Sequence, residues 1–244
     1  MSALASLDDG RLVAAGILDD ATSILVEINP ITGQGTLIGV IGNNNNPGEC
    51  ARIPGLTYDS ATDTLYGLAR NCNGISAPLV TINPDTAEMT TIGPSGLSGG
   101  GFGLAVRDDG TLFAAVWNSE IFSLFTLNRD TGASTLVGTM DTSGITTGPL
   151  GVGGLAFHPV TQQLYASANN GDVGPTDSYL LTVDESVPPS FNVVGQTVDC
   201  FDGIAFAEQV SNNVPTLSEW GFIVMAGILG IAALLVLRRR RITA

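Results

Sequence analysis

The sequence contains no lysine, because all 9 of its basic residues are arginines. This absence excludes Schiff-base catalysis and phosphate sites that are built on a lysine amine. Histidine occurs once, as His158, and a lone histidine beside a proline is typical of a solvated turn. Aromatic residues make up only 6% of the chain, and before residue 214 the only tryptophan is Trp117, which we interpret as a packing residue. The usual groups for nucleophilic or acid–base catalysis are therefore scarce.

Positive charge is scarce and confined largely to one end. The formal net charge is −14, and four of the nine arginines lie at residues 238–241. Without these four, 5 arginines face 23 acidic residues, which leaves a charge of 5 − 23 = −18. A surface of this sign repels nucleic acid and anionic lipid headgroups, so we expect no nucleic-acid partner. We interpret most of the surface acid as a determinant of solubility.

Cysteine is also rare, and the three residues Cys50, Cys72 and Cys200 include no C-x-x-C pair. A cysteine-based zinc site is therefore not expected. Outside the cytoplasm a pair of cysteines can oxidise, and we expect Cys50 with Cys72, since both flank the second repeat of the chain. Cys200 is then a buried thiol or pairs with a cysteine elsewhere.

No segment before residue 214 has a sustained apolar period of 3.6 residues, so helices are not expected there. The chain instead repeats a short glycine-led apolar motif at offsets of 48, 51 and 49 residues. Its copies are Gly55–Tyr58, Gly103–Val106, Gly154–Phe157 and Gly203–Phe206, and Ala3–Leu7 fits the same slot. Three further strands are expected after each copy. Asp9-Gly10 and Asp109-Gly110 are strong hairpin turns, because both central positions accept positive φ.

Four short antiparallel strands in units of about 50 residues are typical of β-propeller blades. We therefore predict an all-β, propeller-like repeat domain over residues 1–208. Its blades are expected at about 3–41, 55–95, 103–140 and 154–197, with an extra strand at 203–207. The units resemble those of bacterial surface propellers, although no Trp-Asp signature is present. A β-solenoid and a two-sheet sandwich remain as alternatives.

The repeats alone do not fix the number of blades in the ring. The extra strand 203–207 is compatible with sealing the seam of a four-bladed ring. It is equally compatible with a larger ring whose remaining blades precede this sequence. The second reading fits better, because residues 4–7 already fill the inner position of the first blade. The N-terminal residues Met1–Asp9 also lack the features of a signal peptide, so we expect the true start to lie further upstream.

The C-terminal region carries the most specific signal. After a linker at 209–213, an apolar run over residues 220–237 predicts a transmembrane helix, which at ~1.5 Å per residue is about 27 Å long. Arg238, Arg239, Arg240 and Arg241 follow it and are expected to stay in the cytoplasm. Everything before residue 214 is then expected outside the cytoplasm.

Residues 214–244 resemble a known bacterial sorting signal. A short motif, an apolar helix and an arginine cluster occur together in this order, as in the IPTL-CTERM family, with a valine in place of its isoleucine. The motif residues are Val214, Pro215, Thr216, Leu217, Ser218, Glu219, Trp220 and Gly221. The resemblance implies a bacterial cell-envelope protein that partners the membrane and an exosortase-like processing enzyme, with surface display or release. An ordinary membrane anchor is the alternative.

Candidate sites in the body are weak. Gly96-Leu-Ser-Gly-Gly100 matches G-x-S-x-G, but no helix is expected after it, so it lacks the setting of a nucleophile. Ca²⁺ is the only cofactor considered, because carboxylates occur in loops rich in oxygen donors, although no EF-hand spacing is present. These carboxylates are Asp172, Asp177, Asp199 and Asp202. No catalytic residue is predicted.

The sequence thus favours an exported propeller that serves binding or surface structure, with an unknown surface ligand. The alternative is an extracellular propeller hydrolase or lyase whose site lies partly in a missing N-terminal region.

Overall fold

A computed structural model describes nine segments of the chain, all within one compact unit, Met1–Glu208. They are residues 3–18, 22–42, 52–70, 77–98, 101–118, 121–140, 151–169, 178–197 and 203–206. The described residues form sixteen strands in four sheets of four strands each. Within each sheet every strand pairs antiparallel with its neighbour in sequence, so each sheet is a simple meander.

The four sheets are the blades of a propeller, and the predicted all-β fold is confirmed. Blade 1 consists of β1 (Ala3–Ser6), β2 (Leu12–Ile17), β3 (Ser23–Ile28) and β4 (Gly35–Ile41). Blade 2 consists of β5 (Arg52–Asp59), β6 (Thr64–Arg70), β7 (Pro78–Ile82) and β8 (Met89–Pro94). Blade 3 consists of β9 (Gly101–Val106), β10 (Leu112–Asn118), β11 (Ile121–Leu127) and β12 (Ser134–Met140). Blade 4 consists of β13 (Gly151–Phe157), β14 (Leu164–Asn169), β15 (Ser178–Asp184) and β16 (Ser190–Gln196).

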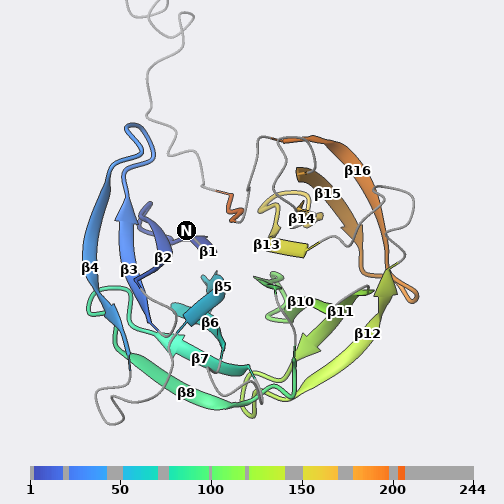
Figure 1. Cartoon of the computed structure of the whole chain (residues 1–244), viewed down its shortest axis with the longest axis horizontal. Coiled ribbons are helices and arrows are strands. Elements are labelled where there is room, and N and C mark those ends of the chain that lie inside the picture. Colours follow the sequence, from blue (N-terminus) through green and yellow to red (C-terminus); the bar gives the residue numbers. More distant parts are fainter. Residues whose placement is uncertain are drawn as a thin grey trace, which may run out of the picture. The chain divides into compact units, whose positions relative to one another are not determined.

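The first strand of each blade lies at the centre of the ring and the fourth at its rim (Figure 1). Glycine is needed at the centre because neighbouring inner strands come very close. A Cβ added to Gly55 would lie 3.1 Å from the Cβ of Leu104 on the next inner strand. A Cβ added to Gly103 would lie 2.7 Å from Cγ of Leu155. The glycine-led repeat is therefore a packing requirement of the ring centre.

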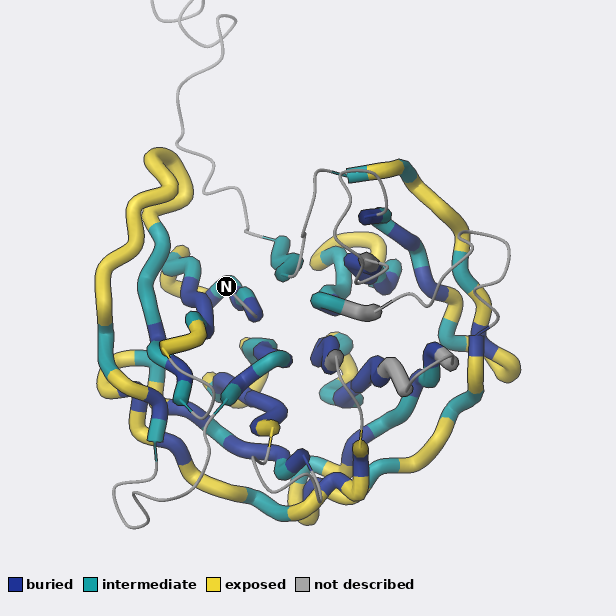
Figure 2. The backbone as a smooth tube through the Cα atoms, viewed as in Figure 1, coloured by how far each residue is buried: buried dark blue, intermediate teal, exposed yellow. Residues whose placement is uncertain are grey.

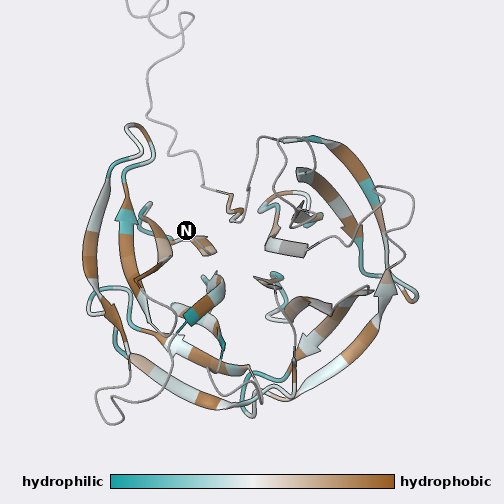
Figure 3. Ribbon diagram, in the orientation of Figure 1, coloured by the Kyte–Doolittle hydropathy of each residue, from teal (hydrophilic) through white to brown (hydrophobic). Residues whose placement is uncertain are grey.

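The hydrophobic core lies between the blades. Successive side chains of a strand point to opposite faces of its sheet, so blades 2 and 3 bury apolar side chains on both faces. Three buried clusters result, one at each boundary between consecutive blades. Figure 2 shows the inner and middle strands as the most buried and the rim strands as the most exposed. Apolar residues alternate with polar ones along the rim strands (Figure 3).

The turn glycines adopt the positive φ that the sequence predicts, but Asp9 and Asp109 do not, so the prediction of two-residue hairpins with positive φ at both central positions is wrong. The turn of blade 1 is longer, because the Leu7 N–H donates to the Arg11 carbonyl and the Gly10 N–H donates to the Leu7 carbonyl. Gly10 and Gly110 have φ of 85° and 81°, and Gly33 and Gly132 have φ of 70° and 77°. In blade 2 an alanine, Ala87, stands at the position equivalent to Gly33 and Gly132, yet it keeps a left-handed φ of 62°. The turn geometry is thus held by its hydrogen bonds, such as the 2.9 Å bond from the Ala87 N–H to the Asn83 carbonyl, even without glycine.

Residues 203–206 occupy an inner position of their own, between β13 and β1 (Figure 1). A Cβ added to Gly203 would lie 3.2 Å from the Cβ of Leu4. On the other side, the Phe206 ring packs edge-on against Tyr165, with centroids 5.3 Å apart. The segment therefore does not seal a four-bladed ring by joining an existing sheet. Residues 203–206 form no strand, so the extra strand predicted at 203–207 is not formed in its described part. The segment nevertheless stands where the first strand of a fifth blade would lie.

Candidate functional site

A hollow of about 240 Å³ opens at the centre of the ring, on the face that carries the turns between the first and second strands. We call it the central hollow, and we call these turns the first turns. It draws residues from all four blades and from the inner segment, so it sits where the blades converge. Its lining includes Ser6, Leu7, Asp8, Tyr58, Asp59, Ser60, Val106, Arg107, Asp108, Phe157, Gln162 and Phe206.

The first turns hold equivalent residues around this hollow because each is closed by the same backbone hydrogen bonds. The N–H of Leu7 donates to the Arg11 carbonyl at 2.8 Å, and the N–H of Arg107 donates to the Thr111 carbonyl at 3.0 Å. In blade 4 the N–H of His158 donates to the Gln163 carbonyl at 2.9 Å. Leu7, Asp59, Arg107 and His158 therefore occupy the same place in successive blades.

Two of these equivalent residues are charged and reach the next blade. Asp59 is almost fully buried, with a side chain 4% exposed, and it forms an ion pair with Arg129 of blade 3. The same guanidinium donates to the Thr62 hydroxyl at 3.0 Å and to the Tyr66 hydroxyl at 3.1 Å. The hydrogen bond with Tyr66, followed by the interaction with Asp59, raises the pKa of Arg129. Because Asp59 and Arg129 neutralise each other, neither charge is left to bind a ligand at the central hollow.

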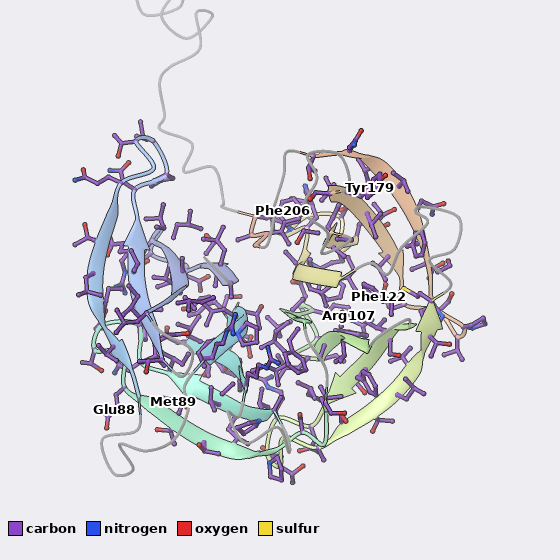
Figure 4. The ribbon with its side chains drawn as sticks, in the orientation of Figure 1. Glu88, Met89, Arg107, Phe122, Tyr179 and Phe206 are labelled. Atoms are coloured by element: carbon purple, nitrogen blue, oxygen red, sulfur yellow. The ribbon has the colours of Figure 1, made fainter. Side chains whose placement is uncertain are left out.

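Arg107 joins blades 3 and 4 in the same manner, but here the first turn supplies the positive charge and the next blade supplies the carboxylate, Glu185. Its Nη1 lies 3.3 Å from Oε1 of Glu185, and its Nη2 lies 2.6 Å from Oδ2 of Asp109. The hydrogen bond from Arg107, followed by the N–H of Thr111, holds the pKa of Asp109 well below its usual range. The guanidinium also lies 5.3 Å from the Phe113 ring centroid. Figure 4 shows Arg107 near the centre of the ring.

A second, larger hollow of about 850 Å³ adjoins the first between blades 1 and 2. Both hollows share Leu7, Asp8 and Tyr58. The second is acidic, with one arginine, Arg11, among its carboxylates, which are Asp8, Asp9, Asp63, Asp85 and Glu88. Burial, with the Tyr58 hydroxyl donating to Asp63 at 2.7 Å, raises the pKa of Tyr58 far above its usual range. Tyr58 therefore stays protonated and acts as a donor.

The charge of the two hollows limits what they can bind. Arg107 and Arg11 are already bonded to carboxylates, so the free potential is negative and disfavours anions. Aromatic rings of Tyr58, Phe157 and Phe206 supply the apolar part of the central lining. Among the residues that the structure describes, no three His, Cys, Asp or Glu side chains are placed so that they could together hold a metal ion. Uncharged polar or cationic ligands fit this surface best.

His158 has a structural task in its turn. Its Nδ1 accepts hydrogen bonds from the N–H groups of Val160 and Thr161, both at 3.2 Å. Its ring also packs edge-on against Phe206, with centroids 5.0 Å apart. These contacts use one ring nitrogen and one ring face to hold the turn and the inner segment together.

Most residues singled out by sequence lie outside the described residues. This holds for the sorting motif 214–221, for Arg238–Arg241, for all three cysteines and for Asp172, Asp177, Asp199 and Asp202. Their roles stay predictions. Gly96, Leu97 and Ser98 of the G-x-S-x-G match are described in a stretch without regular secondary structure, where Gly96 has a left-handed φ of 75°. In the described segments no helix is long and apolar enough to cross a bilayer, and the predicted helix 220–237 lies beyond them.

The central hollow was not predicted from the sequence. Its residues come from turns about 50 positions apart, and none belongs to a motif of known chemistry. The one available signal was positional, because the hollow residues lie at the end of an inner strand, in the turn after it, or at the end of the segment 203–206.

Comparison with known proteins gives one family match and several similarities of fold. Residues 214–241 match the IPTL-CTERM motif. A sequence comparison with curated proteins finds no match. An engineered GH43 glycoside hydrolase with endo-xylanase and exo-arabinofuranosidase activity aligns over 80% of this chain at 12% identity, with a TM-score of 0.58. The chain spans 40% of that structure's length.

Two other structures share the fold at similarly low sequence identity. A GH43 β-1,3-galactosidase aligns over 84% of this chain and 76% of its own at 10% identity, with a TM-score of 0.56. A structure of the nidogen/laminin complex aligns over 84% of both chains at 14% identity, with a TM-score of 0.50. At these identities the likeness shows the propeller fold alone. The chain thus combines a propeller body of four complete blades with an IPTL-CTERM motif at residues 214–241.

Proposed function

We propose that this is an exported cell-envelope protein, sorted through its C-terminal tail, whose propeller serves binding or surface structure outside the cytoplasm. One observation carries the proposal: the IPTL-CTERM match spans the motif, the apolar run and the arginine cluster in order over residues 214–241. An apolar run alone would support only anchoring. The additional motif supports recognition by an exosortase-like membrane enzyme.

The physical basis of the sorting step is the fit of the tail to a bilayer. A helix over residues 220–237 would match a hydrocarbon core of about 30 Å, with Trp220 at the outer interface. Four arginines directly after it would stop translocation, since a charge at the bilayer centre costs about 2.5–3.5 kcal/mol on insertion scales. Pro215–Leu217 would then be presented at the outer surface to the processing enzyme.

The body suits exposure to the exterior. Residues 1–208 contain 5 arginines and 22 acidic residues, so their charge is 5 − 22 = −17, which favours solubility outside the membrane. Binding, where it occurs, would use the central hollow, because the blades converge there and leave polar and aromatic side chains accessible. Its ligand class would be uncharged polar or cationic molecules at the cell surface.

Replacing Arg238–Arg241 by glutamine in the native host tests the proposal. The tail should then slip or stay unprocessed, so the mature mass should rise and the surface level should fall. Arg70→Gln is a matched control, because it removes an exposed arginine of the body and leaves the tail intact. Protease treatment of intact cells should cleave the body of the unmodified protein. An unchanged mass and surface level after the replacement, or a body protected until lysis, would refute the proposal.

Enzymatic activity is not favoured by the present site. Glycoside hydrolysis uses two carboxylates that flank the scissile bond. At the central hollow Asp59 is bonded to Arg129, and the similarity to the GH43 structures is one of fold alone. A hydrolase or lyase completed by further sequence is therefore the weaker proposal.

A further inference from the structure

Each boundary between complete blades is built from the same contact at the rim. A glycine of the fourth strand lies against the turn between the third and fourth strands of the next blade, which we call its third turn. A Cβ on Gly39 would lie 3.1 Å from the Thr86 carbonyl oxygen of blade 2. A Cβ on Gly93 would overlap the Thr131 carbonyl oxygen, and one on Gly138 would overlap Cδ of Pro189. A side chain would therefore overlap its neighbour at the second and third boundaries and would be tightly packed at the first.

The same boundaries carry a bridge between turns. The first turn of one blade reaches the third turn of the next through Arg11 with Asp85, Asp59 with Arg129, and Arg107 with Glu185. The sign of the pair is reversed between the second and third boundaries, where Asp59 and Arg107 hold the same place in their turns. At the first boundary Arg11 lies at the other end of its turn from Leu7, yet its pair joins the same two turns. A blade is therefore docked on its neighbour by its third turn and its fourth strand as well as by its core.

At the ring centre, residues 203–206 reproduce the inner contacts of a fifth blade. Gly203 lies against Leu4 as Gly103 lies against Leu155. Phe206 packs edge-on against Tyr165 with a centroid distance of 5.3 Å, as Phe157 packs against Phe113 at 5.5 Å. Figure 4 shows Phe206 beside blade 4, at the inner end of the interval between blades 4 and 1.

At the rim, the corresponding contacts are open on both sides of the same interval. Gly195 pairs with Leu180 at the position that Gly39, Gly93 and Gly138 hold in their blades. Among the residues that the structure describes, a Cβ on Gly195 would meet nothing within 4 Å. On the opposite side, the third turn of blade 1 exposes Ile31 at 92%, and a Cβ on Gly33 would likewise meet no described residue within 4 Å. Gly132, its equivalent in blade 3, abuts the Gly93 carbonyl oxygen.

We infer that the interval between blades 4 and 1 is the docking site for the three outer strands of a fifth blade, with residues 203–206 as its inner strand. The occupant is polypeptide of this same protein that leads into Ala3. Connectivity decides this, because the fourth strand of each preceding blade runs on to the inner strand of the next, as β4 to β5, β8 to β9 and β12 to β13. By the same rule the fourth strand of the fifth blade runs on to β1.

The open surfaces define what the occupant must present. Its third turn lies on Gly195, so it must approach the rim of blade 4 closely, as Thr131 and Pro189 approach theirs. Its fourth strand meets the third turn of blade 1 and needs a glycine there. The tip of that turn is Ile31 in place of the Asp85 of blade 2, so this contact is apolar. A three-stranded sheet that is apolar on both faces meets these requirements.

The test compares two forms of the protein, the chain of 244 residues and the same chain extended by the coding sequence that precedes Met1 in its gene. Gly195→Val is introduced into both, with Gly138→Val as the matched control at an occupied boundary. We expect Gly195→Val to lower the Tm of the extended form by roughly 4–8 °C, as overpacking of a docked surface does. It should leave the shorter form within about 1 °C, whereas Gly138→Val should destabilise both forms. Amide exchange at residues 30–34 and 190–197 should slow only in the extended form.

Several results would overturn the inference. An equal loss of Tm in a monomeric shorter form would mean that this chain fills the interval itself. A dimeric shorter form that Gly195→Val dissociates would identify a second copy as the occupant. Absence of any effect in the extended form, or native protein whose N-terminal peptide starts at Met1 or Ser2, would also reject it. None of these outcomes depends on the surface ligand or on tail processing, so the proposed function is tested separately.

Discussion

Replacing Arg129 by methionine tests whether the ion pair at the boundary of blades 2 and 3 holds the ring together. The change keeps most of the aliphatic stem and removes the guanidinium, which lies 5.4 Å from the Tyr66 ring centroid and opposite Asp59, whose side chain is 4% exposed. Leaving one partner of a buried pair uncompensated costs about 3–5 kcal/mol. Two features reduce this cost here. Asp59 still accepts from the Ala61 N–H at 3.1 Å and from the Thr62 hydroxyl at 2.7 Å, and Arg129 is itself 28% exposed.

We therefore expect Arg129→Met to lower the free energy of unfolding by about 2–3 kcal/mol. For a domain of this size that corresponds to a loss of roughly 5–10 °C in Tm. Urea unfolding followed by circular dichroism measures the first quantity, and calorimetry measures the second. The double variant Asp59→Asn with Arg129→Met should recover part of the loss, because it no longer buries a lone carboxylate.

Arg11→Met is the matched control at the adjoining boundary. Arg11 lies 2.9 Å from Asp85, but that carboxylate is 70% exposed, so the pair is a surface pair. Such pairs contribute about 0–1 kcal/mol, and the control should stay within this range. If Arg129→Met costs no more than Arg11→Met, burial of Asp59 does not determine the strength of the bridge, and the reasoning fails.

Three further predictions concern packing, pH and the cysteines. Gly103→Ala should lower the free energy of unfolding in a urea titration by about 1–3 kcal/mol, because its Cβ would lie 2.7 Å from Cγ of Leu155. Gly42→Ala is the control and should be close to neutral, because its Cβ would meet no described residue within 4 Å. Hydrogen bonds from the Arg11 N–H to Asp9 and from Arg107 to Asp109 hold the pKa of both carboxylates low in the folded state, so the unfolded chain binds more protons in acid. Stability should therefore fall as the pH drops below about 4, the ordinary carboxyl range, and Asp109→Asn should reduce that slope in urea titrations at successive pH values. Mass spectrometry of exported protein under non-reducing conditions should show a Cys50–Cys72 link and an unlinked Cys200, and three free thiols would contradict this.

The parts of the fold that were predictable are those fixed by local chemistry. Asp9-Gly10 and Asp109-Gly110 place glycine where φ is 85° and 81°, and the glycine-led repeat marks each inner strand. Ala87 shows that the turn persists where its residue preference is absent, since φ is 62° there. At this position the four-strand repeat of the chain predicted the turn, whereas the residue type did not.

The site was not predictable because it is made by contacts between distant segments. Asp59 and Arg129 are 70 positions apart, and neither stands in a recognisable motif. His158 looked like a solvated turn residue, and only the structure shows its Nδ1 accepting from two N–H groups of its own turn. The sorting tail is the opposite case, since its signal is entirely in the order of residues along the chain.

The bridges between turns explain how one ring tolerates such diverged repeats. Each pair of consecutive blades meets through a glycine at the rim and one polar pair at the turns, and two of the three boundaries add a glycine at the centre. These contacts constrain position more than residue type, as the reversed pair Asp59–Arg129 shows beside Arg107–Glu185. A blade can therefore change most of its surface while it keeps its place, and the first turns remain free to present varied side chains at the central hollow. Variation in ligand would then require changes in those turns alone, with the ring unchanged.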